Sequence, residues 1–239
     1  MIKHRIYLFD IDGTLTQPRQ KMSSDHIVAF LSWMTNKNVY LVTGSDYQKV
    51  KEQLPDSVIR KCDGVFCSMA NQFIQNNKII YKKNWKPTQS LVDDLNFLYE
   101  ISEFPYKGKK IIETRVGMIN FSVVGREASQ KQRDVYSRWD KENKERESVV
   151  KVLSNKYTNL DFKIGGQISV DIQPKNSNKS QASKWVREKF KGCELYFFGD
   201  KCSEFGNDYD IAKDIKEHKD GKIFSVEGPN DTISILLRD

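Results

Sequence analysis

Two carboxylates stand two residues apart near the start of the chain, in Asp10-Ile11-Asp12-Gly13-Thr14. They follow the apolar residues 6–9, a pattern typical of a buried strand, so we expect that strand to carry both carboxylates onto the loop at its carboxyl end. Open α/β sheets bind their ligands at that edge. A carboxylate placed there can hold Mg²⁺, or it can attack a phosphoryl group as a nucleophile. The alternative is an acidic turn with no chemical role.

A second acidic loop follows another apolar run, residues 194–198. If the two strands are neighbours in one sheet, four carboxylates meet at one edge: Asp10, Asp12, Asp200 and Asp208. Such a group repels itself unless a cation is bound, and Mg²⁺ suits an all-oxygen site that also meets a phosphate. Lys179 precedes this segment and could pair with a transferring phosphate and with the nucleophilic aspartate. Its alternative interpretation is a surface lysine.

The elements that must position these side chains alternate between strands and helices. Residues 5–10, 39–42 and 63–67 are typical of buried strands, and residues 24–33 and 47–54 of helices. Ser23 or Ser24 is the expected cap of the first helix, and Asp46 the cap of the second. This alternation favours a parallel sheet.

The pattern changes in the middle of the chain. Residues 111–115 and 118–123 indicate antiparallel strands, a long polar helix is expected from about 129 to 156, and strands follow at 162–164 and 168–172. A helix over 181–190 and the strand 194–198 then resume the α/β pattern. We therefore predict an α/β protein with a Rossmann-like parallel-sheet core, residues 1–83 and 177–239, and an inserted α+β domain, residues 84–176.

Composition favours a soluble enzyme. The 239 residues are 38% hydrophobic and 11% aromatic, enough for a substantial core. No apolar run approaches the roughly 18 residues of a membrane span, and the first residues do not resemble a signal peptide. The four cysteines show no paired spacing, which favours reduced thiols. We expect a cytoplasmic protein with no membrane partner.

The net charge is +7. Nucleic-acid binding and the attraction of anionic small molecules both explain such a charge. The lysines are scattered among acidic residues, a pattern more typical of a solvated surface. We therefore expect no nucleic-acid partner.

Short motifs spread over nearly the whole chain carry a family resemblance. The most specific are Pro-Arg-Gln-Lys at 18–21 and Gly-Gly-Gln-Ile-Ser-Val-Asp at 165–171. The others are found at residues 8–17, 44–50, 115–120, 125–126, 197–201 and 206–208. With these motifs the chain resembles the eukaryotic-type α-phosphomannomutase family of the haloacid dehalogenase superfamily. Three segments depart from the family pattern: residues 67–71, residues 175–178, and the middle of residues 200–208, a loop that keeps the family's length.

The resemblance implies roles for the core residues. Asp10 would be the nucleophile, and Asp12 the general acid/base that serves the sugar oxygens. Mg²⁺ would lie between Asp10, the backbone carbonyl of Asp12 and Asp200, with Asp208 nearby. Residues 43–45, including Ser45, would hydrogen-bond the transferring phosphate, and Lys179 would neutralise it.

The resemblance also makes the insertion a cap that closes over the site. It assigns phosphate and substrate binding to Arg19, Arg115, Arg126 and Arg133, and sugar contacts to Ser169 and Asp171, with Asn120 close by. Arginine forks suit a second phosphate dianion. Arg126 and Arg133 would share a helical face if both were helical. The alternative is that both are solvated.

The implied activity is that of a phosphomannomutase, which interconverts mannose 6-phosphate and mannose 1-phosphate through an aspartyl-phosphate and a hexose 1,6-bisphosphate. The bisphosphate would be the activator as well as the intermediate. The resemblance also implies a homodimer formed through the caps, and a place in mannose metabolism that leads to GDP-mannose. A capped sugar-phosphate phosphatase is the alternative enzyme. A catalytically silent binding protein on the same fold is the alternative of another class. The preference for mannose over glucose stays open at this stage.

Overall fold

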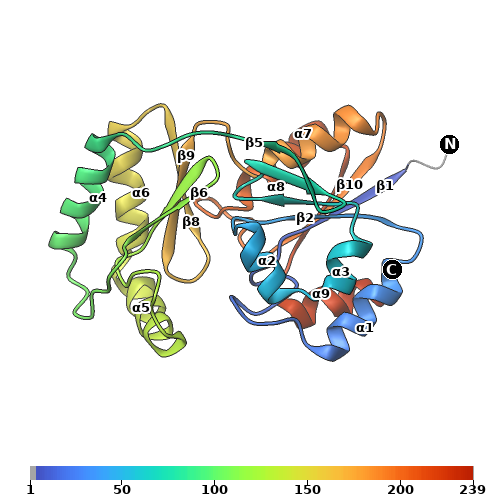
Figure 1. Cartoon of the computed structure of the whole chain (residues 1–239), viewed down its shortest axis with the longest axis horizontal. Helices are drawn as coiled ribbons and strands as arrows, with labels where there is room; N and C mark the ends of the chain where they lie inside the picture. Colours follow the sequence, from blue (N-terminus) through green and yellow to red (C-terminus); the bar gives the residue numbers. More distant parts are fainter. Residues whose placement is uncertain (1–3, 239) are drawn as a thin grey trace. The chain divides into compact units, whose positions relative to one another are not determined.

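A computed structural model describes residues 4–238 and divides the chain into two compact units. The core unit comprises the residues up to Lys82 together with those from Ser177 onwards, and the inserted unit is Lys83–Asn176. Figure 1 shows both units in the colours of the sequence. The chain thus leaves the core unit once and returns to it once. The expected boundaries lay at 83/84 and 176/177.

One mixed sheet forms the centre of the core unit. Its strands are, in spatial order, β11 (Gly221–Ser225), β10 (Glu194–Gly199), β1 (Arg5–Phe9), β2 (Asn38–Val42), β3 (Gly64–Cys67), β4 (Gln72–Gln75) and β5 (Lys78–Lys82). The first five are parallel to one another, while β4 and β5 are antiparallel additions at one edge. The predicted α/β class with a parallel-dominated sheet is confirmed.

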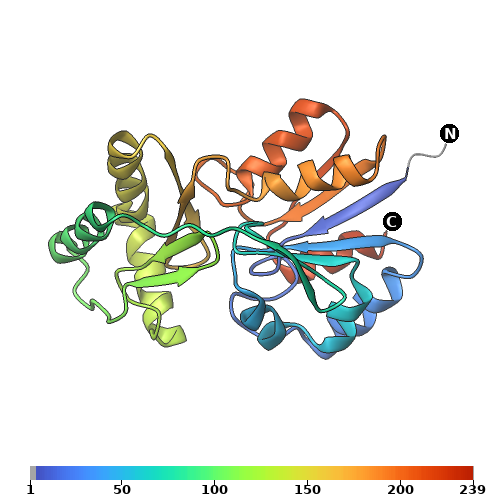
Figure 2. The ribbon, with the colours of Figure 1, turned by 45° about the horizontal axis from the view of Figure 1, so that its top comes forward.

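Helices cover both faces of this sheet, as Figures 1 and 2 show. One face carries α1 (Ser24–Trp33), α2 (Tyr47–Gln53), α3 (Asp56–Lys61) and α9 (Pro229–Leu236). The other carries α7 (Ser180–Lys189) and α8 (Tyr209–His218). Ser23 caps α1 and Asp46 caps α2 through their side chains, which confirms both expected caps.

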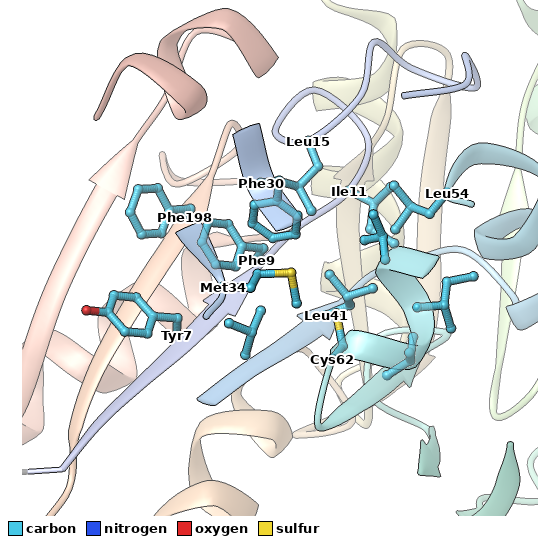
Figure 3. Packing of buried hydrophobic residues seen from close by; sticks show 14 of the residues in the cluster. Tyr7, Phe9, Ile11, Leu15, Phe30, Met34, Leu41, Leu54, Cys62 and Phe198 are labelled. Carbon is cyan, nitrogen blue, oxygen red and sulfur yellow. The ribbon is translucent and has the colours of Figure 1, made fainter. Parts of the chain in front are cut away.

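Alternating side chains of β1 enter two separate apolar cores. Phe9 and Tyr7 face the core of α1, where Phe9 stacks on Phe198 and meets Phe30 edge-on (Figure 3). Leu8 and Ile6 face the core of α7 and α8. Because both faces of the strand are buried, its end is held firmly, and the loop that follows starts from a fixed point.

The inserted unit is an antiparallel sheet with helices on one face. The strand order is β6 (Ile112–Arg115), β7 (Met118–Phe121), β9 (Ser169–Pro174) and β8 (Leu160–Gly165). The helices are α4 (Gln89–Ile101), α5 (Gln130–Asn143) and α6 (Glu145–Lys156). Apolar residues of the strands and helices form one buried core. Since side chains alternate along a strand, the polar residues of β6, β7 and β9 lie on the opposite face.

The prediction of a single long helix over residues 129–156 is wrong, because two helices, α5 and α6, occupy this segment. The chain turns at Lys144, whose φ of 56° lies in the left-handed region. Asp140 stabilises the break, because its carboxylate accepts hydrogen bonds from the backbone N–H and the Nε of Arg146 at 2.9 and 2.8 Å. No glycine or proline marks this position.

Among the described residues, no helix is both long enough and apolar enough to cross a membrane.

Candidate active site

Neighbouring parallel strands bring the predicted acidic loops together. Phe9 of β1 pairs with Phe198 of β10, and the Asp10 N–H continues the ladder to the Phe198 carbonyl at 2.9 Å. Asp10 therefore leaves β1 beside the loop that begins at Asp200. Asp208 immediately precedes α8, and its carboxylate accepts a hydrogen bond from the Lys201 N–H at 3.0 Å. One carboxylate oxygen from each of Asp10, Asp200 and Asp208 lies within 4.8 Å of the others.

Lys179 lies at the centre of this acidic cluster. Its side chain is fully buried, and its Nζ donates to Asp10 Oδ1 at 2.5 Å and to Asp208 Oδ1 at 2.7 Å. Burial opposes the charge of the ammonium group, but the two carboxylates outweigh that effect and raise the pKa of Lys179. The lysine is therefore a permanent cation held against the expected nucleophile, and the surface-lysine alternative is wrong.

The remaining charge of the cluster is still negative. Burial raises the pKa of Asp10 well above its ordinary value, and the charges of Asp208 and Asp200 add to the effect while Lys179 opposes it. Burial and Asp208 raise the pKa of Asp200 to about 6. Three carboxylates face two lysines, since Lys179 contacts Asp10 and Asp208 while Lys201 Nζ lies 3.2 Å from Asp200 Oδ2, and the buried Oδ1 of Asp200 has no hydrogen-bond partner. This all-oxygen donor set fits a divalent cation of the magnesium type.

Gly13 makes room for Asp200. Its φ is +85°, and a Cβ at this position would overlap the carboxylate of Asp200. Glycine is therefore required here both by the backbone conformation and by the close approach of a carboxylate.

Asp12 lies outside the cluster, although all four carboxylates were expected at one edge. Its Oδ1 accepts hydrogen bonds from the Arg19 N–H and from Gln53 Nε2, both at 2.8 Å. Its Oδ2 accepts one from Ser45 Oγ at 3.2 Å. The loop after Asp10 turns tightly, because the N–H groups of residues 14–16 donate to the Ile11 carbonyl and the Gly13 N–H donates to the Thr16 carbonyl. The Asp12 carboxylate therefore points to a different set of donors from those around Asp10. Asp10 and Asp12 therefore have different environments despite their spacing of two residues.

Gln53 is a candidate functional residue that the sequence did not reveal. It is buried at the end of α2 and donates through Nε2 to Asp12 and, at 3.1 Å, to Thr16 Oγ1. Its backbone carbonyl accepts from the Met22 N–H. The sequence signal was weak: a polar residue three positions after Val50, on the side of the helix that faces the core.

The expected phosphate loop, residues 43–45, packs against a strained turn. Ser68, Met69 and Ala70 are fully buried, and each has a positive φ, between 51° and 60°. The N–H groups of Ser68 and Met69 donate to the carbonyls of Ser45 and Thr43. This turn occupies one of the three segments that depart from the family pattern, and it reaches the left-handed region without glycine.

The inserted unit gathers most of its predicted binding residues on the polar face of its sheet. Glu113, Asn120 and Asp171 pair across β6, β7 and β9 in one row, and Asn120 Nδ2 donates to Asp171 Oδ1 at 2.6 Å. Arg115 follows on β6, with Nη1 at 3.8 Å from Asp171 Oδ1. Ser169 stands on the same strand and face as Asp171, and its Oγ donates to the Gly165 carbonyl.

Arg126 and Arg133 do not share a helical face, because α5 begins at Gln130. Arg133 instead reaches back along the chain, donating through Nε to the Ala128 carbonyl at 2.9 Å and through Nη2 to the Arg126 carbonyl at 3.2 Å. Arg133 is 4% exposed, so the solvated alternative is wrong for it. Arg19, in the core unit, is exposed and has a φ of 63°.

Comparison of the whole sequence with known proteins shows which family this chain resembles. Residues 28–238 match the family described as eukaryotic phosphomannomutase. The chain belongs to this family. The resemblance drawn from the motifs is confirmed, as is the expectation of an enzyme that is an intramolecular phosphotransferase.

Curated relatives named phosphomannomutase agree over most of the chain. The protein from Triticum aestivum is 38% identical over 234 residues, which cover 95% of this chain and 91% of the relative. Phosphomannomutase 2 of Dictyostelium discoideum is 34% identical over 250 residues, which cover 98% and 96%.

Solved structures show the same fold at low identity. A haloacid dehalogenase-like hydrolase from Bacteroides thetaiotaomicron has a TM-score of 0.61 and 11% identity, with 99% of each chain covered. An IMP-nucleotidase from Plasmodium falciparum also has a TM-score of 0.61, with 14% identity over 98% of this chain and 66% of that one. These likenesses confirm the fold of the superfamily.

Proposed function

We propose that this family member interconverts mannose 6-phosphate and mannose 1-phosphate, with Asp10 as nucleophile and Asp12 as general acid/base. The observation that carries the proposal is the separation of the two carboxylates. Asp10 lies in an acidic, metal-compatible cluster with Lys179, while Asp12 is held apart by Gln53, Ser45 and the Arg19 N–H. Phosphoryl transfer through an aspartyl-phosphate uses one carboxylate that attacks phosphorus and a second group that exchanges a proton with the sugar oxygen.

In the proposed first step, an Asp10 oxygen attacks phosphorus and the bond between phosphorus and the sugar oxygen breaks. Asp12 gives its proton to that leaving oxygen, and in the return step it takes a proton from the sugar hydroxyl that attacks the aspartyl-phosphate. Lys179 balances charge beside the nucleophile. Asp10, Asp200, Asp208 and the Asp12 carbonyl would hold Mg²⁺, which when bound stabilises negative charge on the transferring phosphate.

The two-phosphate intermediate needs a second anion site. We propose that Arg115, Arg126 and Arg133 of the inserted unit supply it, with Arg19 of the core unit, and that Ser169, Asp171 and Asn120 contact the sugar. The planar guanidinium binds phosphate oxygens in pairs, which a lysine cannot do. A hexose 1,6-bisphosphate would be both activator and intermediate, since it can deliver either phosphate to Asp10.

The phosphatase alternative is not favoured. The curated relatives at 34–39% identity are named phosphomannomutase, and the hydrolases among the solved structures share only 11–16% identity.

We further propose a homodimer through the inserted units. Large apolar side chains on or near α4 are exposed there, with Phe97 at 62% and Ile101 at 56%. A pair of apolar faces of this kind is typical of interfaces between subunits. Light scattering during size-exclusion chromatography measures the mass, and a monomer at micromolar concentration would contradict the dimer.

One assay tests the proposed activity. Purified protein with Mg²⁺ and mannose 1-phosphate is incubated with and without glucose 1,6-bisphosphate, and mannose 6-phosphate and free phosphate are followed together. We expect mannose 6-phosphate as the main product and stimulation by the bisphosphate. Faster release of free phosphate than of mannose 6-phosphate, with the bisphosphate present, would contradict the proposal.

A further inference from the structure

Three arginine nitrogens surround one carboxylate oxygen in the inserted unit. Glu113 Oε2 lies 3.0 Å from Arg115 Nε, 2.6 Å from Arg115 Nη2 and 2.9 Å from Arg126 Nε. The arginine side chains are 6% and 10% exposed and that of Glu113 is 24% exposed. These contacts therefore form away from most of the screening by solvent.

The two arginines come from different parts of the chain. Arg115 ends β6, while Arg126 follows β7 in the loop before α5. Glu113 connects the two arginines, because its carboxylate contacts both of them. Its backbone is held in place by the pairing of β6 with β7, where Glu113 lies opposite Asn120. Arg115 is also bounded on its other side by Asp171, 3.8 Å from Nη1. The carboxylate thus accepts two hydrogen bonds from Arg115 and forms a close ion pair with Arg126, so it holds both guanidinium groups on its own side of the sheet.

In the simplest interpretation, Glu113 only neutralises the charges of two half-buried arginines. The geometry instead favours a role in orienting their side chains. Neutralisation needs a nearby charge but no particular direction, whereas here Nε and Nη2 of Arg115 both donate to one carboxylate oxygen, which fixes the orientation of that guanidinium group. An arginine side chain otherwise has many rotamers, and fixing it in advance lowers the cost of binding an anion.

We propose that Glu113 is a positioning residue for the sugar-bound phosphate that is not being transferred, because it orients Arg115 and Arg126 before that phosphate binds. This inference rests on the proposed function and adds a residue to it that contacts no reacting atom.

The sign of a substitution separates the two interpretations. Glu113→Gln removes a negative charge close to the arginines, so by charge alone it should strengthen the binding of a sugar phosphate. If Glu113 orients the arginines, the same change should weaken that binding, because the amide presents an N–H₂ group as well as an acceptor. Glu113→Ala removes both acceptors and should weaken it further.

The matched control is Glu127→Gln. Glu127 belongs to the same unit and its carboxylate pairs at the surface with Lys110, so the change in net charge is the same while the Glu113 contacts stay in place. Binding of mannose 1-phosphate is measured by calorimetry in an Asp10→Asn background, which prevents turnover. For Glu113→Gln we expect a dissociation constant raised roughly tenfold or more, and for Glu127→Gln a change under about twofold. Unchanged or tighter binding in Glu113→Gln overturns the inference.

Kinetics separate positioning from damage to the fold. In the otherwise unaltered enzyme, Glu113→Gln should raise the KM for mannose 1-phosphate more than it lowers kcat. Phosphorylation of Asp10 by acetyl phosphate depends on the core unit and should be unchanged. If Glu113→Ala fails to fold, the Gln variant still decides the question. Equal losses of acetyl-phosphate labelling and sugar-phosphate binding would identify a structural role and overturn the inference.

The proposed function is tested separately by the unaltered protein. If that protein binds mannose 1-phosphate but does not isomerise it, the function fails while the direction of the Glu113→Gln effect still decides the role of Glu113. If it isomerises the sugar phosphate and Glu113→Gln binds it as tightly, only the inference fails.

Discussion

At the scale of single residues, two aspartates of one short motif have different surroundings. Asp10 is buried among charges, and Asp12 is held by neutral donors. An attacking carboxylate must be ionised at the moment of attack, although burial works against the charge. Lys179 offsets that penalty directly, through a 2.5 Å hydrogen bond to the same side chain.

We expect Asp10→Asn to abolish phosphoryl transfer while the protein stays folded, because a carboxamide is not an attacking anion. The measurement is product formation from mannose 1-phosphate, together with mass spectrometry of protein treated with acetyl phosphate. The melting temperature provides the control for folding. Turnover with a phosphoryl group trapped on another residue would refute the assignment of the nucleophile.

We expect Gln53→Ala to lower kcat roughly tenfold or more, because Asp12 loses a buried hydrogen bond that sets its position. The self-phosphorylation of Asp10 should change less, since acetyl phosphate does not need a sugar oxygen to be protonated. Gln48→Ala is the matched control, as Gln48 lies on the exposed side of the same helix and donates to the Glu52 carboxylate. A similar loss in both variants would point to damage to α2.

At the scale of elements, the site depends on turns that connect strands to helices. The loop after β1 requires a positive φ at Gly13, and the turn after β3 contains three successive non-glycine residues with positive φ. Each left-handed non-glycine residue costs roughly 1–2 kcal/mol. The turn at residues 68–70 is therefore held by its surroundings, which include hydrogen bonds from Tyr81 to the Ala70 carbonyl and from Gln181 to the Met69 carbonyl.

We expect Gly13→Ala to impair both stability and metal binding. Gly192→Ala is the control, since Gly192 has a φ of +77° but a Cβ there meets nothing within 4 Å. The control should therefore show only the backbone cost, roughly 1 kcal/mol. Gly13→Ala should lose more and should require more Mg²⁺ for half-maximal activity, because Asp200 must move. Equal destabilisation and an unchanged Mg²⁺ requirement would show that crowding by Asp200 is unimportant.

We expect Arg133→Ala to weaken mannose 1-phosphate binding roughly tenfold or more, because the turn that carries Arg126 loses two hydrogen bonds from a buried guanidinium. Arg138→Ala, an exposed arginine of α5, is the control for lost positive charge. The KM of each variant is the measurement. Matching values for both variants and the unaltered protein would exclude Arg133 from the binding of the second phosphate.

At the scale of the whole molecule, the acidic cluster links stability to pH and to metal. Asp200 has a pKa of about 6 in the folded protein, against an ordinary value of 3.8. The folded carboxyl holds its proton more tightly, so its contribution to stability is complete below 3.8 and is lost as pH rises through about 6. A bound cation takes the place of the proton and restores stability at neutral pH.

We therefore expect Mg²⁺ to raise the melting temperature clearly at about pH 7.5 and only slightly at about pH 5. Thermal melts with excess Mg²⁺ and with a chelator, at each pH, measure the difference. Asp200→Asn should reduce both the Mg²⁺ effect and the loss of stability between the two pH values. An equal Mg²⁺ effect at both pH values would contradict this linkage.

The order of strands and helices around the site was open to prediction because burial and capping are local properties. Residues 5–10 read as a strand because both faces are apolar, and Ser23 and Asp46 read as caps because their side chains reach their own first turns. The edge strands β4 and β5, the helices α3, α4, α8 and α9, and β11 were not predicted. The break at Lys144 could not be predicted from the sequence, because a left-handed lysine next to a turn stabilised by Asp140 does not change the residue composition of the segment.

The sequence by itself determined which residues are available for the proposed chemistry, because an Asp-x-Asp pair after a buried strand and a second acidic loop after another are read directly from residue types. Only the tertiary structure decided how the carboxylates divide. It set Asp12 against Gln53, which lies 41 residues away, and Lys179 between Asp10 and Asp208. It also joined Arg115 and Arg126 through Glu113. Such contacts depend on distance and direction in space, and the order of residues along the chain contains neither.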